Sequence, residues 1–313
     1  MRVFYSLNDF LRSRASSKKF AVTIGVFDGL HRGHQKIVKM LKKKARGHGL
    51  STMVITFSPH PDNVLPRAKK VPMLISLKHR LRLLTEAGID YTVVLHFTEK
   101  FSRMDAGDFI KKILARINVK EIITGSDFFF GRKRQGSPEA LKKLSGFYDY
   151  GVSVVSGLRS SGEVISSTRI RGLIWKGELK KASGLLMRPV SILGTVVKGH
   201  KRGRIMGFPT ANINPHHEVI PPAGVYAVKI KLGEKKYKGI LNIGTSPTFA
   251  GRLPGGREPG IEVHIFDFKR CIYGRDLEIG FAGRIRSERR FSSPARLSEQ
   301  IKRDEKRARR ILH

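Results

Sequence analysis

The chain has 313 residues, enough for two domains that each bury a core of their own, and 40% of its residues are apolar, as in soluble globular proteins. Cys271 is the only cysteine, which excludes an intramolecular disulfide and predicts a reducing compartment, the cytoplasm. The start of the chain lacks the features of a signal peptide, and no apolar run approaches the roughly 20 residues that span a bilayer, so we expect no membrane association.

The net charge of +36 leaves two explanations open. A surface this basic attracts polyanions, and an RNA-associated protein is one function that would account for it. The lysines and arginines are spread over the whole chain, however, and no aromatic-rich stretch of the kind that stacks single-stranded bases accompanies them. A solvated basic surface explains the same composition, so nucleic acid is a partner that the sequence permits but does not require.

A predicted phosphate site lies near the start of the chain. Residues 20–27 are apolar and predict a buried strand, residues 28–29 form a turn, and a basic helical pattern follows. Glycines at 25, 29 and 33 let a ligand approach the backbone, and the start of the helix offers free N–H groups. His31 and His34, three residues apart, can donate hydrogen bonds to phosphoryl oxygens while remaining near neutral.

Two other roles for the histidine pair remain open. Paired histidines bind zinc in some proteins, although here no glutamate lies between them in metalloprotease spacing and no third ligand is fixed by the pattern. They are also compatible with a plain basic helix surface. The glycine-flanked strand, turn and helix favour the phosphate site.

Strand and helix patterns alternate over the first 185 or so residues. We expect strands at 51–57, 91–97, 119–124 and 152–157, and helices at 76–87, 105–117, 137–148 and 166–176. Such alternation predicts a parallel, Rossmann-like sheet covered by helices. Ligands of these sheets bind beyond the carboxyl ends of the strands. His60, Asp127 and the pair His31 and His34 all follow predicted strands and are expected there.

The pattern changes after Pro189 to short strands separated by glycine, proline and asparagine. They are expected at 191–197, 225–232, 237–243, 261–266 and 277–281, followed by a helix at 294–312. This predicts an antiparallel barrel or sandwich with a terminal helix. We therefore divide the chain into a first domain, 1–187, and a second domain, 188–313.

Three further segments carry polar residues suited to phosphate or proton chemistry. Ser167, Thr168 and Arg171 lie at a predicted helix start, where hydroxyl and guanidinium groups bind phosphate or simply cap the helix. Residues 199–212 are expected to form a glycine-rich basic loop over a ligand. This loop contains Gly207 and ends in Thr210 and Asn212, which offer oxygen ligands of the kind that Mg²⁺ prefers. Glu262, on one face of a strand, could accept a hydroxyl proton, or pair with a basic neighbour.

The first-half segments GVFDGLHRGHQ, TFSPHP, GSDFFFG and ISSTRIR, in this order, resemble the FAD synthetase branch of the HxGH nucleotidyltransferases over roughly residues 20–185. The resemblance implies transfer of AMP from ATP to FMN with release of pyrophosphate. It implies that His31 and His34 contact the ATP phosphates and stabilise the transition state, and that the serine–threonine–arginine segment binds the outgoing phosphates. Residues expected to line this nucleotide site are Gly25, Phe27, Asp28, His60, Asp127, Ser167, Thr168 and Arg171.

The second-half segments GFPTAN, PPAGVYAV, NIGTSPTF, EVHIFDF and IYGRDL resemble riboflavin kinase over roughly residues 188–312. The whole chain is thus similar to the prokaryotic family that joins the two activities, with riboflavin, FMN, FAD and ATP as its substrates and products. The resemblance implies a six-stranded β-barrel that moves the γ-phosphate of ATP to riboflavin, with Gly207, Thr210 and Asn212 at ATP and Mg²⁺. Glu262 is then the general base.

The sequence departs from the family pattern at two positions. Ser246 stands where the family commonly has a basic residue, and Phe129 stands where it often has arginine. An aminoacyl-tRNA synthetase relative shares the paired-histidine site, but the flavokinase-like second half does not support that alternative.

Overall fold

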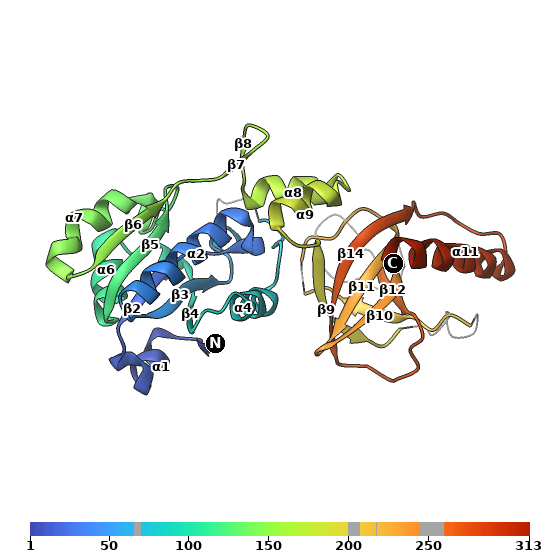
Figure 1. The fold of residues 1–313 in the computed structure, drawn as a ribbon, viewed down its shortest axis with the longest axis horizontal. Coiled ribbons are helices and arrows are strands. Elements are labelled where there is room, and N and C mark those ends of the chain that lie inside the picture. Colours follow the sequence, from blue (N-terminus) through green and yellow to red (C-terminus); the bar gives the residue numbers. More distant parts are fainter. Residues whose placement is uncertain (66–69, 200–206, 217, 245–259) are drawn as a thin grey trace. The chain divides into compact units, whose positions relative to one another are not determined.

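Figure 1 shows the computed structural model of the chain, which describes residues 1–65, 70–199, 207–216, 218–244 and 260–313. It divides into two compact units: unit 1 comprises Met1–Met73 and Leu77–Ser167, and unit 2 comprises Leu74–Ser76 and Thr168–His313. The basic residues 201–204 of the glycine-rich segment, and Ser246, lie outside the described residues. The boundary at 187/188 stays a prediction.

Unit 1 is built on a six-stranded sheet with the order β1-β4-β3-β2-β5-β6, in which every neighbouring pair is parallel. The strands are β1 (Arg2–Phe4), β2 (Phe20–Ile24), β3 (Ser51–Ser58), β4 (Tyr91–His96), β5 (Val119–Gly125) and β6 (Gly151–Val155). The α-helices are α1 (Leu7–Leu11), α2 (Arg32–Gly47), α3 (Pro61–Val64), α4 (Leu77–Glu86), α5 (Glu99–Ser102), α6 (Ala106–Lys112) and α7 (Pro138–Tyr148). The predicted parallel α/β domain is confirmed.

Two features of unit 1 differ from the pattern-based expectation. The helix expected at 105–117 ends at Lys112 and is followed by a separate 3₁₀ turn, Leu114–Arg116, because the backbone of Ile113 leaves the regular helical conformation. Short elements such as β1, α1 and the hairpin β7 (Arg159–Ser160) and β8 (Glu163–Val164) were not predicted, since they are too short to show a period.

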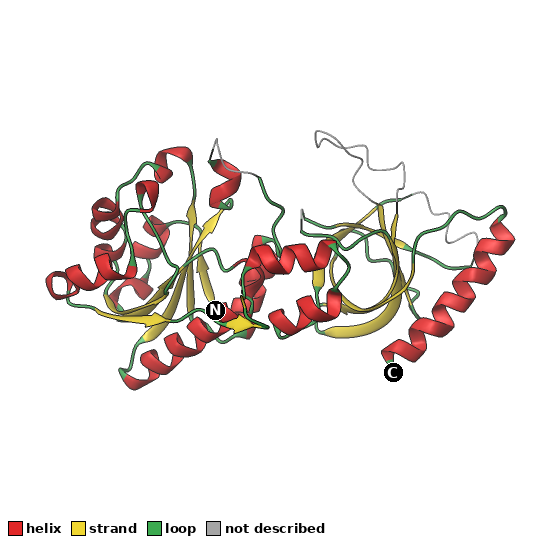
Figure 2. Cartoon of the chain, turned by 90° about the horizontal axis from the view of Figure 1, so that it is seen from above, coloured by secondary structure: helices red, strands yellow, loops and turns green. Residues whose placement is uncertain are grey.

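Unit 2 contains a closed antiparallel barrel with the strand order β10-β13-β12-β11-β14-β9 (Figure 2). Its elements are α8 (Ser167–Trp175), α9 (Leu179–Leu186), β9 (Ser191–Val197), β10 (Ala211–Asn214), β11 (Gly224–Leu232), β12 (Lys235–Gly244), β13 (Gly260–Ile265), β14 (Asp276–Arg286) and α11 (Pro294–Leu312). The barrel and its terminal helix confirm the expected second fold. The sixth strand, β10, was expected to be part of a loop.

Helix α11 packs on the outside of the barrel. Its residues Ala308 and Leu312 are buried against Val225, Ala227 and Ile240 of β11 and β12. Asp304, 2% exposed, accepts a 2.9 Å hydrogen bond from Nε of Arg286 of β14 and forms an ion pair with Nη2 of the same guanidinium at 2.8 Å, which ties the middle of the helix to the barrel. Across the described ranges, no helix is both long and apolar enough to cross a membrane.

Candidate active sites

The turn after β2 positions the histidine pair. Phe27 has a left-handed backbone (φ 53°), and a short 3₁₀ turn, Asp28–Leu30, follows with Gly29 at φ 78°. Glycine suits that conformation because it has no Cβ to clash with the backbone. The chain then enters α2 with His31 as the N-cap residue, so the free N–H groups of the first helical turn lie beside both histidines.

The two imidazoles form one compact unit. Their rings stack at a centroid distance of 3.6 Å, and the backbone N–H of His34 donates a 3.4 Å hydrogen bond to Nδ1 of His31. Phe27 contacts the edge of His34, with ring centroids 5.2 Å apart. The buried Nδ1 of His34 has no hydrogen-bond partner among the described residues, so this side chain retains capacity for a ligand. The predicted proximity of the pair is confirmed.

Burial lowers the pKa of His34 well below its ordinary value, and the neighbouring His31 and the Arg80 cation lower it further. His34 is therefore neutral at physiological pH. A neutral imidazole has one N–H donor and one acceptor nitrogen, so it can donate a hydrogen bond to a phosphoryl oxygen without carrying a full charge.

Arg80, which the sequence analysis missed, is a buried cation beneath this site. It lies on α4 and is 2% exposed. Its Nη1 donates to the carbonyl oxygens of Val26 (2.5 Å) and Phe57 (3.2 Å) and to Oγ1 of Thr56 (2.8 Å). It thus holds together the segments that follow β2 and end β3. The available signal was a cation three residues after Leu77 and four before Leu84, on the apolar face of an amphipathic helix.

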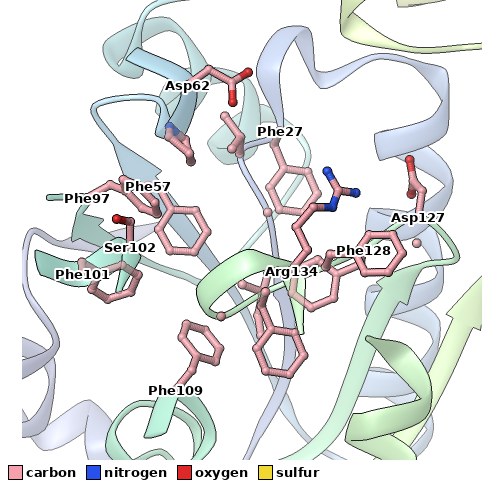
Figure 3. A pocket seen from close by; sticks show the side chains of 18 of the residues that line it. Phe27, Phe57, Asp62, Phe97, Phe101, Ser102, Phe109, Asp127, Phe128 and Arg134 are labelled. Atoms are coloured by element: carbon pink, nitrogen blue, oxygen red, sulfur yellow. The ribbon is translucent and has the colours of Figure 1, made fainter. Parts of the chain in front are cut away.

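A cavity of about 490 Å³ opens beside His34 and is lined mainly by aromatic rings (Figure 3). The phenylalanines that line it are Phe27, Phe57, Phe97, Phe101, Phe109, Phe128, Phe129 and Phe130. They come from segments that are far apart in the sequence but lie at or beyond the carboxyl ends of β2, β3, β4 and β5. Phe129, the departure from the family pattern, lies under the Arg134 guanidinium at 4.5 Å from its ring centroid.

Gly25 and Asp127 also line this cavity. The Asp127 side chain folds back over the end of β5, where a Cβ on Gly125 would lie only 2.7 Å from its Oδ1. Asp28 is buried, at 3% exposed, and its carbonyl oxygen accepts a 2.9 Å hydrogen bond from Oγ of Ser167. Ser167 therefore lies at the histidine turn.

The remaining residues predicted for this site have other surroundings. His60 is the N-cap of α3, where its Nδ1 accepts a 3.1 Å hydrogen bond from the N–H of Asp62. Thr168 is exposed in the first turn of α8, and Arg171 of the same helix is buried, at 5% exposed. Their roles in phosphate binding stay predictions.

The barrel presents a second polar site on three adjacent strands. Asn212 of β10 and Asn242 of β12 are each in register with Glu262 of β13 between them. Oγ1 of Thr210 donates a 3.4 Å hydrogen bond to Oε2 of Glu262. Three strands thus place two amides and a carboxylate in one row, and Thr210, just before β10, adds a hydroxyl.

Thr210 lies between two cavities. One, of about 310 Å³, is lined by Glu262 and Asn242 together with apolar residues of β11, β12 and α11. The other, of about 420 Å³, is lined by Thr210 and by residues 268–273, including Cys271. Such a pair of cavities can hold two substrates that exchange a group at the shared wall.

Asn212 was expected in a loop but lies in β10, where it is 9% exposed. A Cβ on Gly199 would clash with its amide, so the glycine makes room for this side chain. Gly207, at φ 83°, requires the left-handed conformation that glycine adopts freely. Its contact with a nucleotide stays a prediction.

The protein groups of the barrel site are too few to hold a divalent cation without phosphate ligands. Thr210 and Glu262 offer oxygen ligands, which Mg²⁺ prefers. Among the residues that the structure describes, no group of three or more His, Cys, Asp and Glu side chains is arranged to hold a metal ion. Protein groups here would therefore supply only part of a coordination shell, which nucleotide phosphates and water would complete.

The α/β unit has a histidine turn, and the barrel has a row in which Glu262 lies between Asn212 and Asn242. Together they define a chain with two nucleotide-dependent transferase modules. Family comparisons agree: residues 13–169 match the FAD synthetase family, and residues 186–312 match the riboflavin kinase family.

Two curated relatives are described as bifunctional riboflavin kinase/FMN adenylyltransferases. The one from Bacillus subtilis is 38% identical over 93% of this chain and 92% of its own length, and the one from Escherichia coli is 38% identical over 96% and 95%. A solved Streptococcus pneumoniae structure, described as a macrolide-efflux protein, is 31% identical, covers 98% of both chains and has a TM-score of 0.82. The chain belongs to the bifunctional riboflavin kinase/FMN adenylyltransferase family.

Proposed function

We propose that this protein makes flavin nucleotides in two ATP-dependent steps. The barrel phosphorylates riboflavin to FMN, and the α/β unit then transfers AMP from a second ATP to FMN, which yields FAD and pyrophosphate. The observation that carries the proposal is the presence, on one chain, of a stacked histidine turn beside an aromatic cavity and of a separate glutamate–threonine site on a barrel.

In the α/β unit, the aromatic cavity would hold the isoalloxazine ring of FMN, because a flat apolar ring system gains most from aromatic neighbours. An FMN phosphate oxygen would then attack the α-phosphorus of ATP, and the bond from that phosphorus to the bridging oxygen would break. The histidine pair and the N–H groups that start α2 would stabilise the charge that develops on the phosphoryl oxygens. No covalent enzyme intermediate is needed.

In the barrel, Glu262 would accept the proton of the riboflavin 5′-hydroxyl while that oxygen attacks the γ-phosphorus of ATP. The bond from the γ-phosphorus to the oxygen that bridges it to the β-phosphate would break, and ADP would leave. The cavity that Glu262 lines would hold riboflavin, and the cavity beside residues 268–273 would hold the adenosine of ATP, with transfer at Thr210 between them. Thr210 and Asn212 would hold Mg²⁺, which would neutralise phosphate charge.

A product assay tests this division of labour. Purified protein with riboflavin, ATP and Mg²⁺ should give FMN first and FAD later by chromatography. Glu262→Gln should abolish FMN formation but still adenylylate supplied FMN, whereas His31→Ala with His34→Ala should form FMN and stop there. Absence of both products, or loss of both activities in both variants, contradicts the proposal. The exposed, unbridged Cys271 is compatible with the reducing cytoplasm, where we place these reactions.

A further inference from the structure

A square of lysines occupies the outer face of the β11–β12 hairpin. Lys229 lies directly opposite Lys238, and Lys231 lies directly opposite Lys236. Opposed residues of an antiparallel pair have Cβ atoms about 5 Å apart, and the two pairs follow each other by about 7 Å along the strands. All four side chains therefore project from the same small area of the barrel.

This arrangement is unfavourable for the barrel alone, because like charges directly opposite each other destabilise a sheet. Lys229, Lys236 and Lys238 are exposed and form no ion pair with any described residue. The acidic residue nearest in register is Glu278 of β14, which lies opposite Lys231 and also accepts a hydrogen bond from Ser191. One carboxylate does not balance four ammonium groups.

Helix α11 carries a second set of unbalanced cations. In its second half, from Ile301 on, the exposed basic residues without an ion pair to a described residue are Lys302, Arg303, Lys306, Arg307 and Arg310. The acids of the same stretch are already engaged: Asp304 binds Arg286, and Glu305 binds Arg309. Several of these cations are four residues apart, a spacing at which like charges repel on a helix.

The two sets are contiguous. The end of α11 packs through Leu312 on Ala227 and Ile240, which face each other across the hairpin. Figure 1 shows the C-terminal end of α11 beside β11 and β12. The next pair on the same face of the hairpin is Lys229 and Lys238, so the lysine square begins one pair beyond the contact with the helix. The helical cations extend over about 12 Å and the lysine square adds about 7 Å. We call this combined area the basic surface.

We propose that the basic surface binds the phosphate backbone of a nucleic-acid duplex. The helical cations alone extend over about 12 Å, a length on which a duplex carries roughly 7 negative charges, and this is longer than a single nucleotide. No aromatic residue of the described parts of β11, β12 and α11 is among the exposed ones, so the surface has no platform for single-stranded bases. Ile311, 39% exposed, is the one large apolar side chain exposed there, which disfavours insertion into a membrane.

The test uses the full chain and a fluorescently labelled RNA duplex of about 20 base pairs, with a DNA duplex of the same length as a second arm. The variant replaces Lys229, Lys231, Lys236 and Lys238 with Gln. Anisotropy titrations over a range of salt should show wild-type binding whose slope of log K against log salt is reduced by about 3 to 4 in the variant, because each lost phosphate contact removes about 0.9. The loss should be the same for unrelated duplex sequences.

The matched control replaces Lys39, Lys43, Lys111 and Lys143 with Gln, which removes the same charge from exposed positions of unit 1. It should retain the wild-type slope. Continued FMN formation by the hairpin variant shows that its barrel is folded. Equal loss of slope in both variants, absence of duplex binding by the wild-type protein, or binding to phosphatidylserine vesicles without binding to either duplex would each overturn the proposal.

Discussion

Replacing Arg80 with methionine tests whether the buried cation sustains the adenylyltransferase site. The substitution keeps an unbranched side chain but removes the donor that contacts Val26, Thr56 and Phe57. We expect weaker folding of unit 1 and a slower adenylyl transfer, with FMN formation by the barrel preserved. The reason is that one guanidinium fixes the backbone on both sides of the cavity.

The size of the effect is worked from two opposing contributions. Nη1 of Arg80 donates all three hydrogen bonds, and because the donor is charged they contribute roughly 5 kcal/mol in total to the stability of the folded state. Burial lowers the pKa of Arg80 to about 10, against the attraction of Asp28, and relief of that burial returns about 3 kcal/mol. The expected net loss is therefore about 2 kcal/mol in the free energy of unfolding, and misplacement of the turn should slow adenylyl transfer by about tenfold or more.

The assay is urea unfolding together with the pH profile of FAD formation from supplied FMN. Without the cation the pKa of His34 rises toward its ordinary value, so the acid limb of the profile should move to higher pH. Arg80→Lys, which keeps the charge, should leave that limb in place. The matched control is Arg82→Met on the same helix, which removes an ion pair to Glu86 and should cost less than about 1 kcal/mol. Equal stability of the two methionine variants, with an unshifted acid limb, refutes the reasoning.

Three further predictions concern single side chains. Folding lowers the pKa of His34, so the unfolded chain binds more protons than the folded chain as pH falls below about 6.5. The free energy of unfolding should therefore fall with pH, by at most about 1.4 kcal/mol per pH unit. His34→Gln should remove this part of the pH dependence in urea unfolding. Modification of Cys271, the only cysteine, with a bulky maleimide should block FMN formation and spare adenylyl transfer, because Cys271 lines the cavity beside Thr210. The Cys271→Ser protein should resist the reagent. Inhibition that persists in this variant would mean that the reagent acts at a residue other than Cys271. Asp304→Ala should cost about 3 kcal/mol in urea unfolding because it strands the Arg286 guanidinium, and a cost as small as that of an exposed ion pair contradicts this.

The fold of each half could be predicted because its sequence repeats a local pattern. The alternation of strand and helix periods over the first half, and of short strands and turns over the second, indicated a parallel α/β unit followed by an antiparallel one. Strand β10 was not predicted because what defines it is not local. Only pairing with β9 and β13 makes a strand of the four residues Ala211–Asn214, and this pairing turned an expected loop into the wall that carries Asn212.

The sequence by itself determined the local arrangement of the histidine turn, because its strand, glycines, N-cap and histidines are contiguous and their geometry is local. Only the tertiary structure decided what surrounds that turn. The aromatic cavity gathers rings from the ends of four strands, and Arg80 reaches the turn from a helix more than forty residues away in the chain. A sequence pattern records which residues are apolar or charged, but the partner of a buried group is set by long-range packing.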